Sequence, residues 1–176
     1  MATAFHESNI DWAFDDSCLV IQYDDSSWYR QHFQGCAESA AVDFIAVAGT
    51  TGWLVEVKDF TTEAPVPSKD LVAIVTKKAR DTLAGVFAGA KNANAPQEKD
   101  IFVSFLQVTS LRVAFHCERP TNRSKLFKNL PDPADLQQKL RKSLRAIDTK
   151  VVLLDCTSNL PKVPWTATWN PNGARR

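Results

Sequence analysis

Hydrophobic and polar residues alternate along short stretches of this 176-residue chain, a period-two pattern that predicts half-buried β-strands. Two pairs of such stretches are separated by turn residues and predict hairpins, one over residues 9–23 and one over residues 43–59. A further alternating stretch at residues 111–117 and a continuous apolar stretch at residues 150–155 predict two later strands. The continuous stretch is typical of a strand that is central or parallel in its sheet.

Apolar residues at helical spacing predict four helices, with capping residues at their ends. The predicted helices are one of about ten residues that ends near Gly35, one from Ser68 or Asp70 to about Ala90, one around residues 101–106, and one from Asp132 to about Ile147. Hairpins early in the chain and helix-linked strands later predict an α/β (α+β) fold, in which helices flank a central mixed β-sheet.

The length of the chain and its composition, 44% hydrophobic and 23% charged residues, predict a single domain over residues 1–176. Its core is expected at about residues 18–117, followed by a C-terminal α/β extension at about residues 130–156. The tail at residues 157–176 contains several prolines and is expected to be irregular.

The sequence has no apolar run of the ~20 residues that a membrane span requires, and its N-terminus has no signal-peptide pattern. The cysteines occur singly, without C-x-x-C pairs or histidines at zinc-ligand spacing; they are Cys18, Cys36, Cys117 and Cys156. Such cysteines are typical of reduced core thiols, so a cytoplasmic protein without a structural zinc is expected. The three histidines do not cluster either, and His116 is expected to be structural rather than a ligand.

Charge is divided unevenly along the chain. Residues 1–60 contain ten acidic and two basic residues, a net charge of −8, and the rest contains ten acidic and nineteen basic residues, a net charge of +9. An acidic and a basic half suit a polyanionic substrate. Mutual neutralisation of the halves across the fold explains the division equally well.

The hairpin at residues 43–59 carries charged residues where a half-buried strand normally has apolar ones. If Gly49–Gly52 is a four-residue loop, Asp43 lies opposite Lys58 and one diagonal step from Glu56. All three side chains then share one face of the hairpin. An exposed cross-strand ion pair is the simpler explanation, but the apolar residues beside them on that face favour a functional site.

Two carboxylates and a lysine on one face are the residue types of a hydrolytic metal site. Magnesium prefers hard oxygen ligands, polarises a phosphate oxygen and lowers the pKa of a bound water. A lysine nearby can orient or deprotonate the attacking water. The hairpin therefore predicts a divalent-metal site directed at phosphodiesters.

An acid on one strand and Glu-x-Lys on the next, followed by a helix and another strand, resembles the PD-(D/E)XK nuclease superfamily. The resemblance covers about residues 18–117 and implies a restriction-endonuclease-like fold. It implies that Asp43, Glu56 and the carbonyl of Val57 bind Mg²⁺, for which Mn²⁺ can substitute. It also implies that Lys58 assists the attacking water.

Members of this superfamily often have a further acid before the hairpin. Glu38 is the nearest in sequence, and Asp24 and Asp25 are alternatives. Val42 stands where the pattern commonly has proline.

Basic residues outside the hairpin are candidates for binding a nucleic-acid backbone, although any of them can equally be a solvated surface residue. The candidates are Lys78, Arg119, Arg123, Lys125, Lys128, Lys139, Arg141, Lys142 and Arg145.

The resulting hypothesis is a Mg²⁺-dependent endonuclease that hydrolyses DNA and does not associate with membranes. It would act as a homodimer or with a partner protein of a defence or mobile-element system. The alternatives are a catalytically inactive nucleic-acid-binding or scaffold protein of the same fold, and an RNA-directed nuclease.

Overall fold

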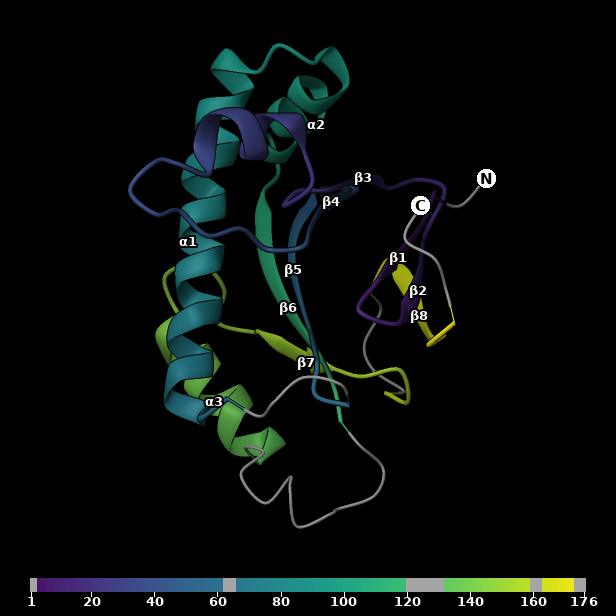
Figure 1. The fold of residues 1–176 in the computed structure, drawn as a ribbon. Helices are drawn as coiled ribbons and strands as arrows, with labels where there is room; N and C mark the ends of the chain where they lie inside the picture. The colour runs from purple at the N-terminus through teal and green to yellow at the C-terminus, as the bar shows by residue number, and fades with distance from the viewer. Residues whose placement is uncertain (1–2, 62–65, 120–131, 159–162, 173–176) are drawn as a thin grey trace.

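The computed structural model describes residues 3–61, 66–119, 132–158 and 163–172, which form two β-sheets and a layer of helices (Figure 1). The fold is therefore of the mixed α/β class that the sequence predicts. The five-stranded central sheet consists, in spatial order, of β3 (Leu19–Gln22), β4 (Phe44–Ala48), β5 (Thr51–Asp59), β6 (Ser110–Glu118) and β7 (Val152–Leu154). Its first three strands pair antiparallel, and β5, β6 and β7 are parallel to one another.

A smaller antiparallel sheet covers one face of the central sheet, and the helices cover the other (Figure 1). The strands of the smaller sheet, in order, are β1 (Thr3–Glu7), β2 (Ile10–Phe14) and β8 (Trp165–Trp169). The helices are η1, a π-helix (Tyr29–Phe33), α1 (Ser68–Asn92), α2 (Pro96–Leu106) and α3 (Pro133–Ser143).

Both faces of the central sheet are buried, because β4 and β5 send apolar side chains in both directions. Ile45 and Leu54 pack beneath the helices. Phe44 and Val55 pack against the smaller sheet, where the ring centroid of Trp12 lies 5.3 Å from that of Phe44. A polar side chain on either face therefore lies among apolar ones and needs a partner.

The expected hairpin over residues 9–23 is wrong. Its two strands form, but β2 pairs with β1 and β8, whereas β3 pairs with β4. The actual hairpin turns at Ser8 and Asn9, whose φ angles of 53° and 59° suit a two-residue turn. Period-two alternation identifies a strand but does not specify its partner.

All four expected helices are present, and the bounds of α1 agree within two residues. The first is a five-residue π-helix instead of a helix of about ten residues, α2 begins earlier, at Pro96, and α3 ends at Ser143 instead of continuing to Ile147. The α3 N-cap is as expected: the Asp132 side chain accepts hydrogen bonds from the amides of Ala134 and Asp135. No helix in the described ranges has the length and apolarity needed to span a bilayer.

Of the last two strands, the first agrees with expectation and the second does not. A strand central or parallel in its sheet was expected, and β7 is parallel to β6 and lies at the edge of the sheet. The tail expected to be irregular contains β8, which pairs with β2 along its whole length. Pro164 and Pro171 flank β8 and so remove no hydrogen-bond donor from it.

Candidate active site

The hairpin of β4 and β5 has a two-residue turn, which corrects the expected four-residue loop. Ala48 pairs with Thr51, so Gly49 and Thr50 form the turn. Gly49 has a φ of +57°, which suits the first position of a tight hairpin turn. Gly52 belongs to β5 instead, and a Cβ there would lie 3.0 Å from the ring of Phe105.

This turn shifts the register of the hairpin by two residues: the ladder ends with Phe44 opposite Val55, so Asp43, one residue before β4, lies on the side of Glu56 rather than of Lys58. Because the shift is even, Asp43, Glu56 and Lys58 still share one face. Directly opposed residues of an antiparallel pair have Cβ atoms about 4.5–5.5 Å apart. The negative charge of Asp43 acts on the carboxyl of Glu56 and raises its pKa, as expected for side chains on neighbouring strands.

Asp43 directly precedes β4 and is held there by hydrogen bonds of its side chain and its main chain. Its carboxylate Oδ2 accepts a hydrogen bond from the amide of Val57 at 2.6 Å, and its carbonyl accepts one from the amide of Tyr23 at 2.8 Å. In an extended strand the N–H and C=O of one residue point the same way. The carbonyl of Val57 is therefore directed to the side of β5 on which Asp43 lies.

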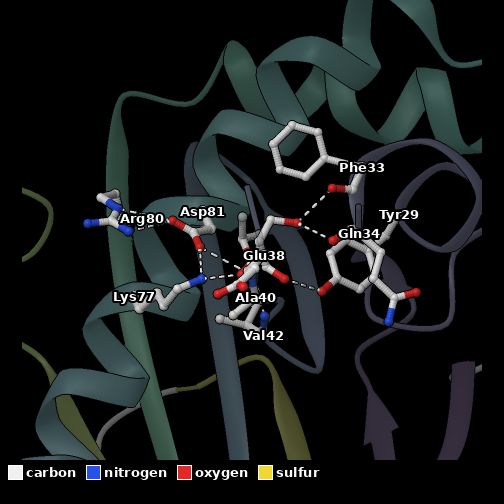
Figure 2. Close-up of polar contacts among 11 residues, drawn as sticks. Tyr29, Phe33, Gln34, Glu38, Ala40, Val42, Lys77, Arg80 and Asp81 are labelled. Atoms are coloured by element: carbon white, nitrogen blue, oxygen red, sulfur yellow. Dashed lines mark hydrogen bonds and ion pairs between the residues drawn. The ribbon is translucent and has the colours of Figure 1, made fainter. Parts of the chain in front are cut away.

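The segment before Asp43 is anchored to α1 (Figure 2). The side chains of Asp81 and Thr82 accept hydrogen bonds from the amides of Ala40 and Val42, each at 3.1 Å. Lys77 and Arg80 hold the Asp81 carboxylate in place, at 2.7 and 2.8 Å. The helix thus fixes where the strand bearing Asp43 begins.

Glu38 belongs to this anchoring segment. It is exposed and has a φ of 54°. Its main-chain carbonyl accepts a hydrogen bond from Lys77 at 2.5 Å (Figure 2). Among the described contacts, Glu38 contributes its main chain and not its carboxylate.

Glu56 is fully buried and forms an ion pair with Lys78 of α1. The Lys78 ammonium lies 2.7 Å from one carboxylate oxygen of Glu56 and 2.8 Å from the other. Burial and then the charge of Asp43 raise the pKa of Glu56, and Lys78 and Lys58 oppose this rise. Burial lowers the pKa of Lys78, but Glu56 and Asp43 raise it by more.

Asp24 is the third carboxylate of this cluster. Its pKa is raised to about 7, first by burial and then by the negative charge of Asp43, and Lys78 opposes this rise. Its Oδ1 atom is buried and has no hydrogen-bond partner among the described residues. Asp24 and Asp25 were the expected alternatives to Glu38, and distance along the sequence did not show which of these acids reaches the hairpin.

The donor set suits a divalent cation. The carboxylate of Asp43 acts on the carboxyls of both Asp24 and Glu56, while Lys78 and the half-buried Lys58 supply two positive charges. Burial raises the pKa of both Asp24 and Glu56, so these carboxyls keep their protons to a higher pH than exposed ones, and Oδ1 of Asp24 is buried without a hydrogen-bond partner among the described residues. A divalent cation would favour their ionised form, and hard carboxylate oxygens are the ligands that Mg²⁺ prefers.

The other basic residues that were candidates for binding nucleic acid differ in their surroundings. Arg123, Lys125 and Lys128 lie outside the described residues. Arg119 is partly buried, and its charge opposes the rise that burial causes in the pKa of the Cys117 thiol.

The basic residues of α3 also differ from one another. Arg141 bonds to the carbonyl of Val151 at 3.1 Å. Lys139 forms an exposed ion pair with Asp135 at 2.7 Å. A cavity of about 540 Å³ between α1 and α3 is lined by Lys69, Val72, Lys139, Lys142, Ser143 and Arg145.

No protein-family model and no solved structure matches this chain. The chain is similar to a protein named cysteine--tRNA ligase from Neisseria meningitidis serogroup A / serotype 4A (strain DSM 15465 / Z2491), with 27% identity over 165 residues. The similarity covers 76% of this chain and 24% of that protein, so the chain spans about a quarter of the relative's length.

Proposed function

We propose that this chain is a Mg²⁺-dependent nuclease that hydrolyses DNA phosphodiesters at the cluster of Asp43, Glu56 and Lys58. The observation that carries the proposal is the buried group of three carboxyls at the end of the β4–β5 hairpin, with an unpaired oxygen on Asp24. An ordinary exposed ion pair does not explain it, because Glu56 is 0% exposed and Asp43 is 8% exposed. Burial of this kind is costly and is typical of functional sites.

Each residue of the cluster has a distinct role in this proposal. Asp43 and Glu56, with Asp24 and the carbonyl of Val57, would hold Mg²⁺ or Mn²⁺, which supplies phosphate polarisation and a water of lowered pKa. Lys58 is half-buried on the same face and orients or deprotonates the attacking water.

Lys78 was expected to contact nucleic acid, but its position gives it another role. Its ammonium neutralises Glu56 and keeps this buried carboxylate oriented toward the helix-covered face. In the proposed site Lys78 is a positioning residue for Glu56.

The arrangement of elements supports a restriction-endonuclease-like core. The β4–β5 hairpin carries the acid and Glu-x-Lys, α1 follows it across the sheet, and β6 then returns parallel to β5. This is the order that the resemblance implies. The small sheet of β1, β2 and β8 is an addition to it.

DNA is the proposed substrate because a polyanion complements the basic cavity between α1 and α3. Lys69, at its edge, lies nine residues before Lys78 on α1, roughly 14 Å along the helix axis. A homodimer or a partner protein of a defence or mobile-element system would supply the remaining contacts to the duplex.

RNA is the second candidate substrate, and one observation favours it. The similar Neisseria protein is named as a ligase for tRNA. The same phosphodiester chemistry applies to RNA, so the test includes both nucleic acids.

The test uses the purified chain with plasmid, linear, branched and single-stranded DNA and with RNA, in Mg²⁺ or Mn²⁺. We expect cleavage of at least one substrate, and Lys58→Ala to slow it by about 100-fold or more with Mg²⁺ binding retained in calorimetry. Asp43→Asn and Glu56→Gln should lose both Mg²⁺ binding and cleavage. Asp100→Asn, a change of an exposed acid on α2, is the matched control and should keep both.

Two results would contradict the proposal. A folded chain that cuts none of these substrates in either metal but still binds nucleic acid is the inactive binding or scaffold protein. Cleavage that survives Asp43→Asn and Glu56→Gln places the chemistry elsewhere.

A further inference from the structure

A second cluster of metal-ligating side chains lies on the opposite face of the central sheet from Asp43 and Glu56. Nε2 of His116 lies 2.7 Å from Oε1 of Glu118 and 3.8 Å from Sγ of Cys156. The three atoms all lie within 4.8 Å of one another. Because Cys156 follows β7 and the other two residues end β6, only the tertiary structure brings them together.

Main-chain geometry positions all three ligands. His116 and Glu118 are two residues apart on β6 and so point to the same face. The amide of Cys156 donates a hydrogen bond to Glu118 Oε1 at 2.5 Å, which fixes the turn after β7. That turn is closed by Asp155, whose carboxylate accepts hydrogen bonds from the amide of Thr157 and the hydroxyl of Ser158.

The cluster is largely screened from water. The side chains of His116 and Glu118 are 1% and 10% exposed, and the ring of Trp12 packs edge-on against His116 at 4.8 Å. The other ring nitrogen of His116, Nδ1, is buried and makes no hydrogen bond with described residues. The orientation of the ring therefore depends on Trp12 and on what Nε2 contacts.

The distances are close to those of a tetrahedral zinc site. Typical Zn–N, Zn–O and Zn–S bonds separate a nitrogen from an oxygen ligand by about 3.4 Å and a nitrogen from a sulfur ligand by about 3.6 Å. The separation of His116 Nε2 from Cys156 Sγ, 3.8 Å, already fits. The separation of His116 from Glu118, 2.7 Å, is that of a hydrogen bond and needs to widen by roughly 0.7 Å, a shift within side-chain reach.

The surrounding charge favours a cation over a reactive thiol. Negative charges of Glu118, Asp155 and Asp59 act on Cys156. Reactive cysteines occupy electropositive surroundings, whereas an acidic environment stabilises a bound metal ion. The Cys156–His116 pair is therefore better suited to hold a metal than to act as a nucleophile and base.

We propose that His116 Nε2, Glu118 Oε1 and Cys156 Sγ form a Zn²⁺ site that joins the end of β6 to the turn after β7. Imidazole, thiolate and carboxylate are the ligand types that zinc takes, and three protein ligands leave a fourth position for water. Zinc displaces the thiol proton to solvent as it binds. This site is independent of the proposed nuclease site and does not require it to be active.

The test is Co²⁺ substitution in the intact chain, followed by zinc competition. A thiolate ligand gives a thiolate-to-cobalt charge-transfer band, which the oxygen ligands of Asp43 and Glu56 cannot give. We expect this band in the wild type, its loss on adding Zn²⁺, and about one zinc per chain by elemental analysis. Zn²⁺ should also raise the melting temperature.

Ligand and control variants locate the site. Cys156→Ser and His116→Gln should lose the band and weaken zinc binding at least about 100-fold, with folding checked by circular dichroism. Cys36→Ser on the surface and Cys117→Ser on the opposite face of β6 should keep the band, as should Asp43→Asn.

Three outcomes overturn the proposal. They are a folded wild type without the band, a band that survives Cys156→Ser, and a band that disappears in Cys36→Ser or Cys117→Ser. If Cys156→Ser does not fold, His116→Gln decides on the same readout. Failure of the Asp43 site to bind Mg²⁺ leaves these outcomes unchanged, so the two proposals fail separately.

Discussion

At the scale of single residues, Lys78 and Asp24 decide the character of the hairpin site. Lys78 was a candidate for binding a nucleic-acid backbone, but its ammonium contacts both carboxylate oxygens of Glu56. Asp24, two dozen residues into the chain, adds a carboxylate to the group. Neither contact has a local sequence signal, because both depend on where α1 and the end of β3 lie over the sheet.

Lys78→Met is expected to destabilise the protein by about 3–5 kcal/mol, because it leaves the buried carboxylate of Glu56 unpaired. Chemical denaturation measures this change. Adding Glu56→Gln should recover a large part of the loss. Lys139→Met, which breaks the exposed pair with Asp135, is the control and should cost less than about 1 kcal/mol. Equal losses in the two lysine variants would contradict a buried ion pair.

Asp24 should make stability fall as the pH rises. Its pKa in the folded chain is about 7, against an ordinary value of 3.8. Between these values the folded state holds a proton that the unfolded state has released, so the free energy of unfolding decreases from about pH 4 to about pH 7. The Asp24→Asn protein lacks this decrease. Its free energy of unfolding, relative to that of the wild type, should therefore increase from about pH 4 to about pH 7.

Denaturation curves from pH 4 to pH 8, with and without Mg²⁺, measure the effect. If Asp24 lies at the proposed metal site, Mg²⁺ restores stability to the wild type at pH 7–8 and does less for Asp24→Asn. Parallel pH profiles for the two proteins would show that Asp24 does not titrate in this window.

At the scale of elements, the two-residue turn at Gly49 and Thr50 sets which residues of β4 and β5 face each other. The pairing of β4 with β5 is shifted by two residues from the expected register. This shift changes which residues lie opposite each other but leaves each side chain on the same face of the sheet. Gly52 was assigned to the loop by its composition, but it is needed for packing: Phe105 of α2 lies against the strand there.

Gly52→Ala tests that packing. The added Cβ would lie 3.0 Å from Phe105 and 3.1 Å from Val108, so we expect a loss of about 1–3 kcal/mol in the free energy of unfolding. Gly35→Ala is the matched control, because nothing lies within 4 Å of its added Cβ. A Gly52→Ala protein as stable as Gly35→Ala would mean that α2 does not press on β5.

At the scale of the whole molecule, the acidic N-terminal part of the chain and the more basic remainder contact each other at the hairpin site. The acidic N-terminal part supplies the carboxylates of the hairpin site, and α1 supplies the lysine that neutralises one of them. Further basic residues gather at the cavity between α1 and α3. The two explanations of the charge pattern therefore apply to different basic residues. Lys78 neutralises an acidic residue within the fold, whereas the basic residues at the cavity are the candidates for binding a polyanion.

Lys142→Ala combined with Arg145→Ala tests the second explanation. If the cavity contacts the nucleic-acid backbone, the double variant should bind duplex DNA more weakly, and the slope of log affinity against log salt should shrink by about 2. Fluorescence anisotropy at several salt concentrations measures both. Lys91→Ala, at the far end of α1, is the control, and an equal effect of that change would indicate non-specific attraction.

Much of the architecture was predictable because it depends on local pattern. Alternation located the strands of the β4–β5 hairpin and β6, and helical spacing with the Asp132 cap located the helices. β1 and β8 were missed, because they complete a small sheet whose strands come from the two ends of the chain. Pairing between distant strands depends on a complementary face that no single stretch of sequence displays.

The sequence determined the strand period, which places Glu56 and Lys58 on one face of β5. That Asp43 shares this face was predicted on the assumption of a turn with an even number of residues, and the two-residue turn meets that condition. Only the tertiary structure decided which groups meet them there. Lys78 and Asp24 reach the cluster, and Glu38 contributes its main chain to the neighbouring segment. Likewise, nothing in the sequence connects Cys156 with His116 and Glu118. The pairing of β7 with β6 places their ligand atoms within 4.8 Å of one another. The physical reason is the same in both cases: period and propensity act over a few residues, whereas charge partners and ligand sets form across elements that only packing brings together.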